Sequence, residues 1–123
     1  MLFQRKIYTP TIWDKLQLHD KYDYKSDNVI IGPGSKELIF QTQLVLDCDV
    51  LLPSPSWVSY EPQAQILNKK IHWIKTDATT NWHITPDDLN KISQNLHQVG
   101  KLLILNSPNN PSGTTHNNLE ELA

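Results

Sequence analysis

The fold of this chain is decided by residues 102–114, which read Leu-Leu-Ile-Leu-Asn-Ser-Pro-Asn-Asn-Pro-Ser-Gly-Thr. An apolar run that stops abruptly in a loop of this composition is typical of a buried strand in a parallel sheet. Ligands of such sheets bind just beyond the carboxyl ends of the strands. Asn110 precedes a proline, which favours extended backbone and lets the side-chain amide point into a cleft. The local sequence alone favours a simple turn, because Asn-Pro and Ser-Gly pairs are common in turns.

Composition limits the classes of protein that the chain can belong to. Its 123 residues suggest one domain or part of one, and its formal net charge of −2 comes without a basic run. No nucleic acid partner is therefore expected. Cys48 is the only cysteine, which excludes an internal disulfide and fits a reducing compartment. No apolar stretch approaches membrane-spanning length, and residues 1–10 lack the apolar core of a secretory signal, so we expect a cytoplasmic protein without a membrane partner.

The chain begins with a weakly patterned N-terminal segment, residues 1–27, and its regular pattern runs from residue 28 to residue 123. A short apolar run at 28–31 ends in Gly-Pro-Gly-Ser-Lys, residues 32–36. A helix should follow, with apolar positions at helical spacing: Leu38, Thr42, Val45 and Leu46. The N–H groups at the start of that helix suit a phosphate, although helix capping explains a Gly-Ser pair equally well.

A second strand is predicted at 49–53, and a helix should begin near residues 59–61 because Pro62 fits only its first turn. Trp57 would then lie at the carboxyl end of the strand, where its ring could stack on a flat ligand. The alternative is a core tryptophan, since Trp57 shares helical spacing with Tyr60, Ala64 and Leu67. Without further context, the core role is favoured.

A third strand is predicted at 70–75, with Ile71 and Trp73 on one face and His72 on the other. We interpret His72 as structural, and none of the 5 histidines has the spacing of a metal ligand, so no metal site is expected. Thr85 and Pro86 start another helix. Its buried stripe should be Leu89, Ile92, Leu96 and Val99, with Gly100 as its stop. A fourth strand at 101–106 follows, and a last helix should bury Leu119, Leu122 and Ala123.

Alternating strands and helices predict an α/β fold, in which helices cover a mainly parallel sheet. Parallel strands bring their carboxyl ends to one side of the sheet. A phosphate site at 34–36, the aromatic plane of Trp57 and the amide of Asn110 would converge there. Together they suit a flat, phosphorylated cofactor.

Three segments, in this order, resemble those of class I/II aminotransferases, the fold-type-I enzymes that use pyridoxal 5′-phosphate. Residues 29–40, Val-Ile-Ile-Gly-Pro-Gly-Ser-Lys-Glu-Leu-Ile-Phe, look like the family's phosphate-loop segment. Residues 49–60, Asp-Val-Leu-Leu-Pro-Ser-Pro-Ser-Trp-Val-Ser-Tyr, look like its P-x-[YFW]-x-x-Y segment. Residues 107–114, Ser-Pro-Asn-Asn-Pro-Ser-Gly-Thr, are similar to its PNNPTG motif, with Ser112 where threonine is more usual.

The resemblance implies a role for each matching residue. Gly34, Ser35 and Lys36 would hold the phosphate of pyridoxal 5′-phosphate, largely through backbone N–H groups. Trp57 would stack on the pyridine ring, and Asn110 would hydrogen-bond the phenolic oxygen. The substrates would be an amino acid and a 2-oxo acid, between which the enzyme transfers an amino group.

The resemblance also implies that the complete protein is a homodimer, with Tyr8 similar to a tyrosine that reaches the phosphate of the neighbouring subunit. The lysine that anchors the cofactor in this family has no counterpart here, and neither has the substrate-binding arginine, since Arg5 is the only arginine. We therefore interpret residues 28–123 as the N-terminal part of a large domain, truncated at its C-terminus. No catalytic residue is assigned, and we predict that this chain alone is inactive and poorly soluble.

Two alternatives remain open from the sequence. Fold-type-I lyases and decarboxylases share the same cofactor-binding elements, and the residues that decide between these reactions are not in this chain. The other alternative is a non-catalytic α/β remnant that binds a phosphorylated ligand. A flavodoxin-like or nucleotide-binding domain fits the alternation but leaves Trp57 and Asn110 unexplained.

Overall fold

The computed structural model describes residues 30, 32–94, 96, 100–116 and 122. The chain divides into two compact units, residues 1–38 and residues 39–123. The second unit contains the sheet and both of its apolar clusters. The boundary predicted between residues 27 and 28 stays a prediction.

The second unit is built on three parallel strands: β1 (Cys48–Ser54), β2 (Ile71–Lys75) and β3 (Gly100–Leu103). They lie in the order β2-β1-β3, with Val50 opposite Ile71 on one side and opposite Leu102 on the other. The α/β fold with a parallel sheet is therefore confirmed. β1 is the central strand, and its first six residues are all buried. A central strand covered on both faces needs such a continuous run rather than an alternating pattern.

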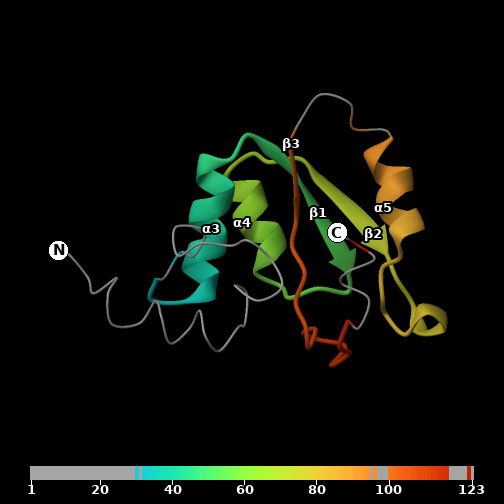
Figure 1. Ribbon diagram of the computed structural model, residues 1–123. Coiled ribbons are helices and arrows are strands. Elements are labelled where there is room, and N and C mark those ends of the chain that lie inside the picture. Colours follow the sequence, from blue (N-terminus) through green and yellow to red (C-terminus); the bar gives the residue numbers. More distant parts are fainter. Residues whose placement is uncertain (1–29, 31, 95, 97–99, 117–121, 123) are drawn as a thin grey trace, which may run out of the picture. The chain divides into compact units, whose positions relative to one another are not determined.

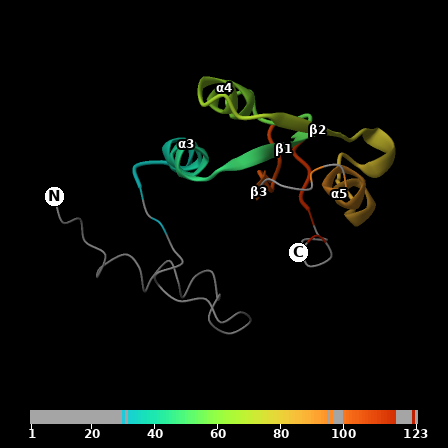
Figure 2. The same cartoon turned by 90° about the horizontal axis from the view of Figure 1, so that it is seen from above.

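The two faces of the sheet carry separate apolar clusters. On one face Val50 and Leu52 pack against Tyr60 and Ala64 of helix α4 (Tyr60–Ile66). On the other face Leu51 packs in a cluster with Ile74, Ile84 and Leu96, against which Leu89 and Ile92 of helix α5 (Pro86–Ser93) also pack. Figure 2 shows α4 and α5 on opposite sides of the strands.

Helix α3 (Ser35–Val45) confirms the predicted helix, but of the positions at helical spacing only Leu38 and Thr42 are half-buried. Val45 is 77% exposed and Leu46 43% exposed, whereas Gln43 is fully buried. Gln43 Nε2 donates a hydrogen bond of 3.4 Å to Gln63 Oε1 on α4. The packed side of α3 therefore combines Ile39, which packs against the cluster of Tyr60 and Ala64, with the buried amide of Gln43.

Helix α5 begins as predicted and ends earlier. The Thr85 side chain accepts a hydrogen bond of 3.3 Å from Asp88 N, and Asp88 Oδ2 accepts one of 3.0 Å from Thr85 N. These reciprocal bonds form a capping box, which satisfies N–H groups that the first turn leaves unpaired. The helix ends at Ser93, so Leu96 is buried but lies outside it, and Gly100 starts β3 instead of stopping the helix.

Several predicted features fall outside the described residues. The strand at 28–31 is represented only by Ile30, which has no regular structure and is 73% exposed. Tyr8, Val99, Leu119 and Ala123 are not described. Leu122 is helical and packs against the cluster on the α5 face. Within the described part of the chain, no helix is long and apolar enough to cross a membrane.

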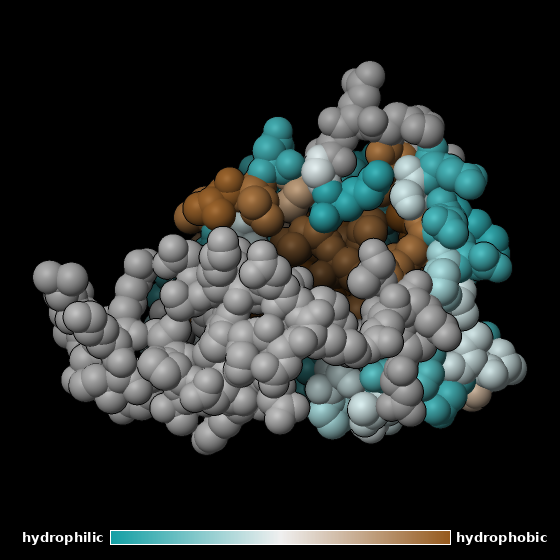
Figure 3. Space-filling model, viewed as in Figure 1, coloured by the Kyte–Doolittle hydropathy of each residue, from teal (hydrophilic) through white to brown (hydrophobic). Residues whose placement is uncertain are grey.

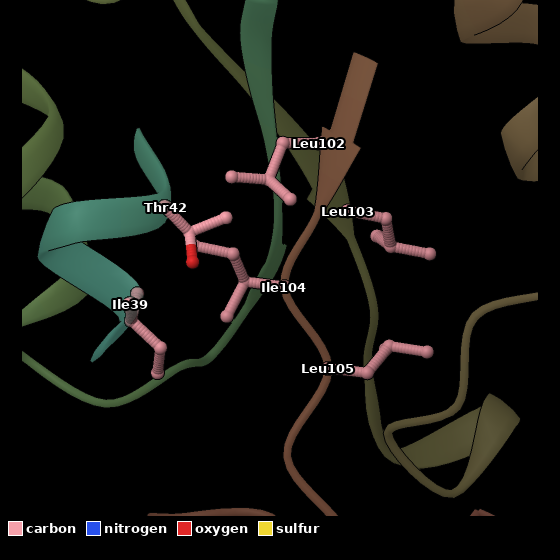
Figure 4. A pocket seen from close by; sticks show the side chains of 6 residues that line it. All are labelled: Ile39, Thr42, Leu102, Leu103, Ile104 and Leu105. Carbon is pink, nitrogen blue, oxygen red and sulfur yellow. The ribbon is translucent and has the colours of Figure 1, made fainter. Parts of the chain in front are cut away.

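The outer side of β3 is open among the described residues, because β3 pairs only with β1. A groove of about 200 Å³ follows this strand and is lined by Ile39, Thr42 and residues 102–105. Leu102 and Ile104 point towards α3, and Leu103 and Leu105 point to the opposite side (Figure 4). Figure 3 shows apolar surface over β3, between α3 and α5.

Candidate functional site

Trp57 lies in the connection that leads from the carboxyl end of β1 to α4. Its indole is half-buried and meets the Tyr60 ring edge-on, with ring centroids 5.5 Å apart and planes at 82°. Burial raises the pKa of the Tyr60 hydroxyl above its ordinary value. Trp57 thus packs against the cluster that holds Tyr60 while it stands at the strand end where ligands bind in parallel sheets.

Asn110 lies in the loop that follows β3, and its side chain is exposed. The loop is closed by two backbone hydrogen bonds, from Asn109 N to Thr114 O at 2.8 Å and from Gly113 N to Asn109 O at 2.7 Å. Gly113 has a φ of +72°, a conformation that glycine adopts without the steric cost of a Cβ. Within the described chain the Asn110 amide makes no hydrogen bond, so its donors are available to a ligand.

The structure brings the Trp57 connection and the Asn110 loop together. Asn109 Nδ2 donates to the Pro55 carbonyl oxygen at 3.2 Å, across 54 residues of sequence. Figure 1 shows the two segments at the same end of the sheet, beyond the arrowhead of β1. This is the arrangement predicted for neighbouring parallel strands, because β1 and β3 pair directly.

The predicted phosphate residues Gly34, Ser35 and Lys36 lie at the start of α3 and are exposed. The first hydrogen bond of the helix runs from Leu38 N to Gly34 O at 3.2 Å. A Cβ on Gly34 would meet no atom within 4 Å. These residues belong to the first unit, and their convergence with Trp57 and Asn110 stays a prediction.

Histidine rings take part in two described contacts in the second unit, one with a carboxylate and one between two rings. His72 Nε2 lies 2.7 Å from Asp49 Oδ2 across β1 and β2, and its structural role stays a prediction. His83 and His116 place their rings 4.8 Å apart at 38°. Among the residues that can be described, no group of three or more His, Cys, Asp or Glu could hold a metal ion.

Residues 8–123 match the family model "Aminotransferase class I and II". This chain belongs to that family. An aspartate aminotransferase of Bacillus sp. (strain YM-2) is 32% identical over 117 residues, which cover 91% of this chain and 29% of the relative. A probable aspartate/prephenate aminotransferase of Rickettsia conorii is 30% identical over 114 residues, 90% of this chain and 27% of the relative.

Solved structures of class I and II aminotransferases confirm the fold. The crystal structure of the aspartate aminotransferase from Rhizobium meliloti superposes with a TM-score of 0.76 at 25% identity, over 93% of this chain and 29% of that one. The Thermotoga maritima aspartate aminotransferase gives a TM-score of 0.69 at 28% identity, over 87% and 29% of the two chains. This member of the family spans less than a third of the length of these relatives.

Sequence reasoning did not single out Asn109, whose side chain joins the two loops of the candidate site. The motif at 107–114 includes Asn109, but only Asn110, which precedes the proline, was given a role. The available signal was that a parallel sheet places the loops after neighbouring strands beside each other, so an amide next to Asn110 could bridge to the loop of Trp57.

Proposed function

We propose that this chain is the N-terminal part of the large domain of a pyridoxal 5′-phosphate-dependent aminotransferase. The observation that carries the proposal is the family match over residues 8–123. The contact between the Trp57 and Asn110 loops through Asn109 supports it. The complete protein would transfer an amino group between an amino acid and a 2-oxo acid, and the names of the relatives make aspartate the first donor to try.

The described residues fit the cofactor. Trp57 offers a half-buried aromatic side chain, and Asn110 offers an exposed amide without a hydrogen-bond partner in the described chain. They follow neighbouring strands, where a flat ring with a phenolic oxygen would find a stacking surface and a hydrogen-bond donor. Gly34, Ser35 and Lys36 would bind the phosphate. When bound, pyridoxal phosphate supplies the electron sink for the reaction.

The catalytic lysine would come from sequence that this chain does not contain, so the chain alone should not catalyse the reaction. We also propose that the complete protein is a cytoplasmic homodimer. Incubating the purified 123-residue chain with cofactor, aspartate and a 2-oxo acid should give no turnover above the rate of free cofactor. Turnover above that rate would contradict the proposal that the catalytic lysine lies outside this chain.

The intact mass of the native protein, meaning the protein as the cell makes it, tests the proposal most directly. A mass well above 14.2 kDa is expected, because the relatives are more than three times as long as the matched segment. The native protein should then bind pyridoxal phosphate and transaminate aspartate. A native mass of 14.2 kDa would contradict the proposal of an active aminotransferase and would favour a non-catalytic remnant.

A further inference from the structure

We propose that Asn109 is a positioning residue of the cofactor site, which fastens the Asn110 loop to the Trp57 connection. The inference rests on the proposed function, because it concerns how the two ring-binding residues are held relative to each other. Asn109 itself does not need to touch the cofactor. Asn109 positions the adjacent residue, Asn110, relative to the segment that carries Trp57.

The side chain of Asn109 uses its amide nitrogen for two contacts. Nδ2 donates to the Pro55 carbonyl oxygen at 3.2 Å and to Ser112 Oγ at 2.8 Å. An amide NH₂ group has two hydrogens to donate, so one side chain can serve both acceptors. Pro55 lies two residues before Trp57, and Ser112 lies two residues after Asn110. Asn109 therefore joins the two segments at points close to both ring-binding residues.

The Asn110 loop is closed on itself, so a bond to one of its residues restrains the rest. Ser112 Oγ and Thr114 Oγ1 lie 2.7 Å apart, and the His116 N–H donates to Ser107 Oγ at 3.0 Å. With the backbone bonds between Asn109, Gly113 and Thr114, these contacts tie together both ends of the loop. The hydrogen bond to Pro55 is the described side-chain link from this loop to the β1–α4 connection.

The chemistry of this link calls for a donor at position 109. Asn109→Asp keeps the size of the side chain but replaces the donating NH₂ with a carboxylate oxygen, which faces the Pro55 carbonyl and Ser112 Oγ. Asn109→Ala removes the link without adding charge. Asn90→Asp, on the exposed surface of α5, makes the same chemical change elsewhere and is the matched control.

The test uses the native protein loaded with pyridoxal phosphate, and it follows the visible absorption of the bound cofactor as pH changes. A hydrogen bond donated to the phenolic oxygen favours its charged form, so misplacing Asn110 should move the midpoint of this titration to higher pH. We expect Asn109→Asp and Asn109→Ala to raise this midpoint and to weaken cofactor binding about 10-fold, the order of magnitude expected when one hydrogen bond that holds a binding residue is lost. Asn90→Asp should leave both unchanged.

Ser112→Ala keeps the bond to Pro55 and removes one partner of Asn109, so it should give a smaller change in the same direction. It also keeps the test decisive if the Asn109 variants do not fold. If the wild type fails to bind the cofactor, the proposed function is wrong. If the wild type binds and the variants keep its midpoint and affinity, or lose only thermal stability, the positioning role is wrong.

Discussion

At the scale of single residues, polar side chains in this chain mainly define turns and helix starts. Asp77 shows this in the short 3₁₀ helix η2 (Ala78–Thr80), where Asp77 Oδ1 accepts hydrogen bonds from Thr79 N at 2.8 Å and Thr80 N at 3.3 Å. The Thr79 hydroxyl also donates to Asp77 Oδ1 at 2.6 Å. The hydroxyl of Thr79, followed by its backbone N–H, lowers the pKa of Asp77 below its ordinary value.

Because its pKa is lowered in the folded state, Asp77 makes a contribution to the stability of the protein that depends on pH. Because its pKa is depressed in the folded state, the stabilisation is fully present above the unfolded-state value of 3.8 and is lost as pH falls through the lower folded value. Asp77→Asn keeps an acceptor that cannot titrate, so the loss of stability on acidification should be smaller in this variant. The measurement is the melting temperature of the wild-type native protein and of the Asp77→Asn variant at a series of pH values from neutral to acidic. Identical acid profiles for wild type and variant would contradict the prediction.

A second residue at which a substitution should change the stability of the protein is Gly100. A Cβ at this position would lie 2.8 Å from the Asp47 carbonyl oxygen, where the backbone leaves no room for it. Gly100→Ala should therefore lower the free energy of unfolding by about 1–3 kcal/mol, the usual cost of overpacking. Gly34→Ala, compared after removal of any bound cofactor, is the control, because a Cβ there meets nothing within 4 Å. Urea denaturation measures the free energy of unfolding of both variants. If Gly100→Ala is as stable as Gly34→Ala, the steric argument is wrong.

At the scale of elements, the contact between α3 and α4 depends on a buried amide pair. Gln43 is fully buried and Gln63 is 8% exposed, and their hydrogen bond is long at 3.4 Å. Gln43 Oε1 is buried without a hydrogen-bond partner among the described residues. A buried acceptor left unpaired costs stability, so the two helices are held together with less free energy than an apolar contact of the same shape would provide.

Replacing both amides should therefore lower the free energy of unfolding less than replacing Gln63 alone. The double variant Gln43→Leu/Gln63→Leu is expected to be more stable than Gln63→Leu alone, because both members of the amide pair leave together. Gln63→Leu alone should destabilise by about 1–3 kcal/mol, because it leaves the Gln43 amide buried without its acceptor. Gln65→Leu on the exposed side of α4 is the control. A double variant less stable than Gln63→Leu would contradict this account.

At the scale of the whole molecule, the apolar groove beside β3 is the feature from which we expect poor solubility of the isolated chain. The groove lies along the strand edge, lined by Ile39, Thr42 and residues 102–105, and the candidate cofactor residues do not line it. Open strand edges with apolar side chains pair with other chains unless charges or a covering element prevent it. Leu44 and Val45 on α3 add further exposed apolar surface, at 58% and 77%.

The 123-residue chain expressed alone should therefore be poorly soluble or form assemblies above 14.2 kDa. Leu105→Lys would place a charge in the groove and should raise the soluble, monomeric fraction. Val58→Lys is the control, because Val58 is already 80% exposed and does not line the groove. Light scattering after size-exclusion chromatography measures both. A wild-type monomer with a sharp cooperative melt and dispersed amide signals would contradict the prediction.

The sequence by itself determined three parallel strands and the family, but it also predicted a strand at 28–31 that is not seen at Ile30, and it extended the last strand to residue 106, whereas β3 ends at Leu103. Continuous apolar runs such as 102–105, and capping residues such as Thr85, are local signals that need no knowledge of distant contacts. The tertiary structure alone decided that α3 buries Gln43 and exposes Val45, that β3 begins at Gly100, and that Asn109 reaches Pro55. These features depend on which segments become neighbours after folding, and no local pattern encodes a hydrogen bond between residues 54 positions apart.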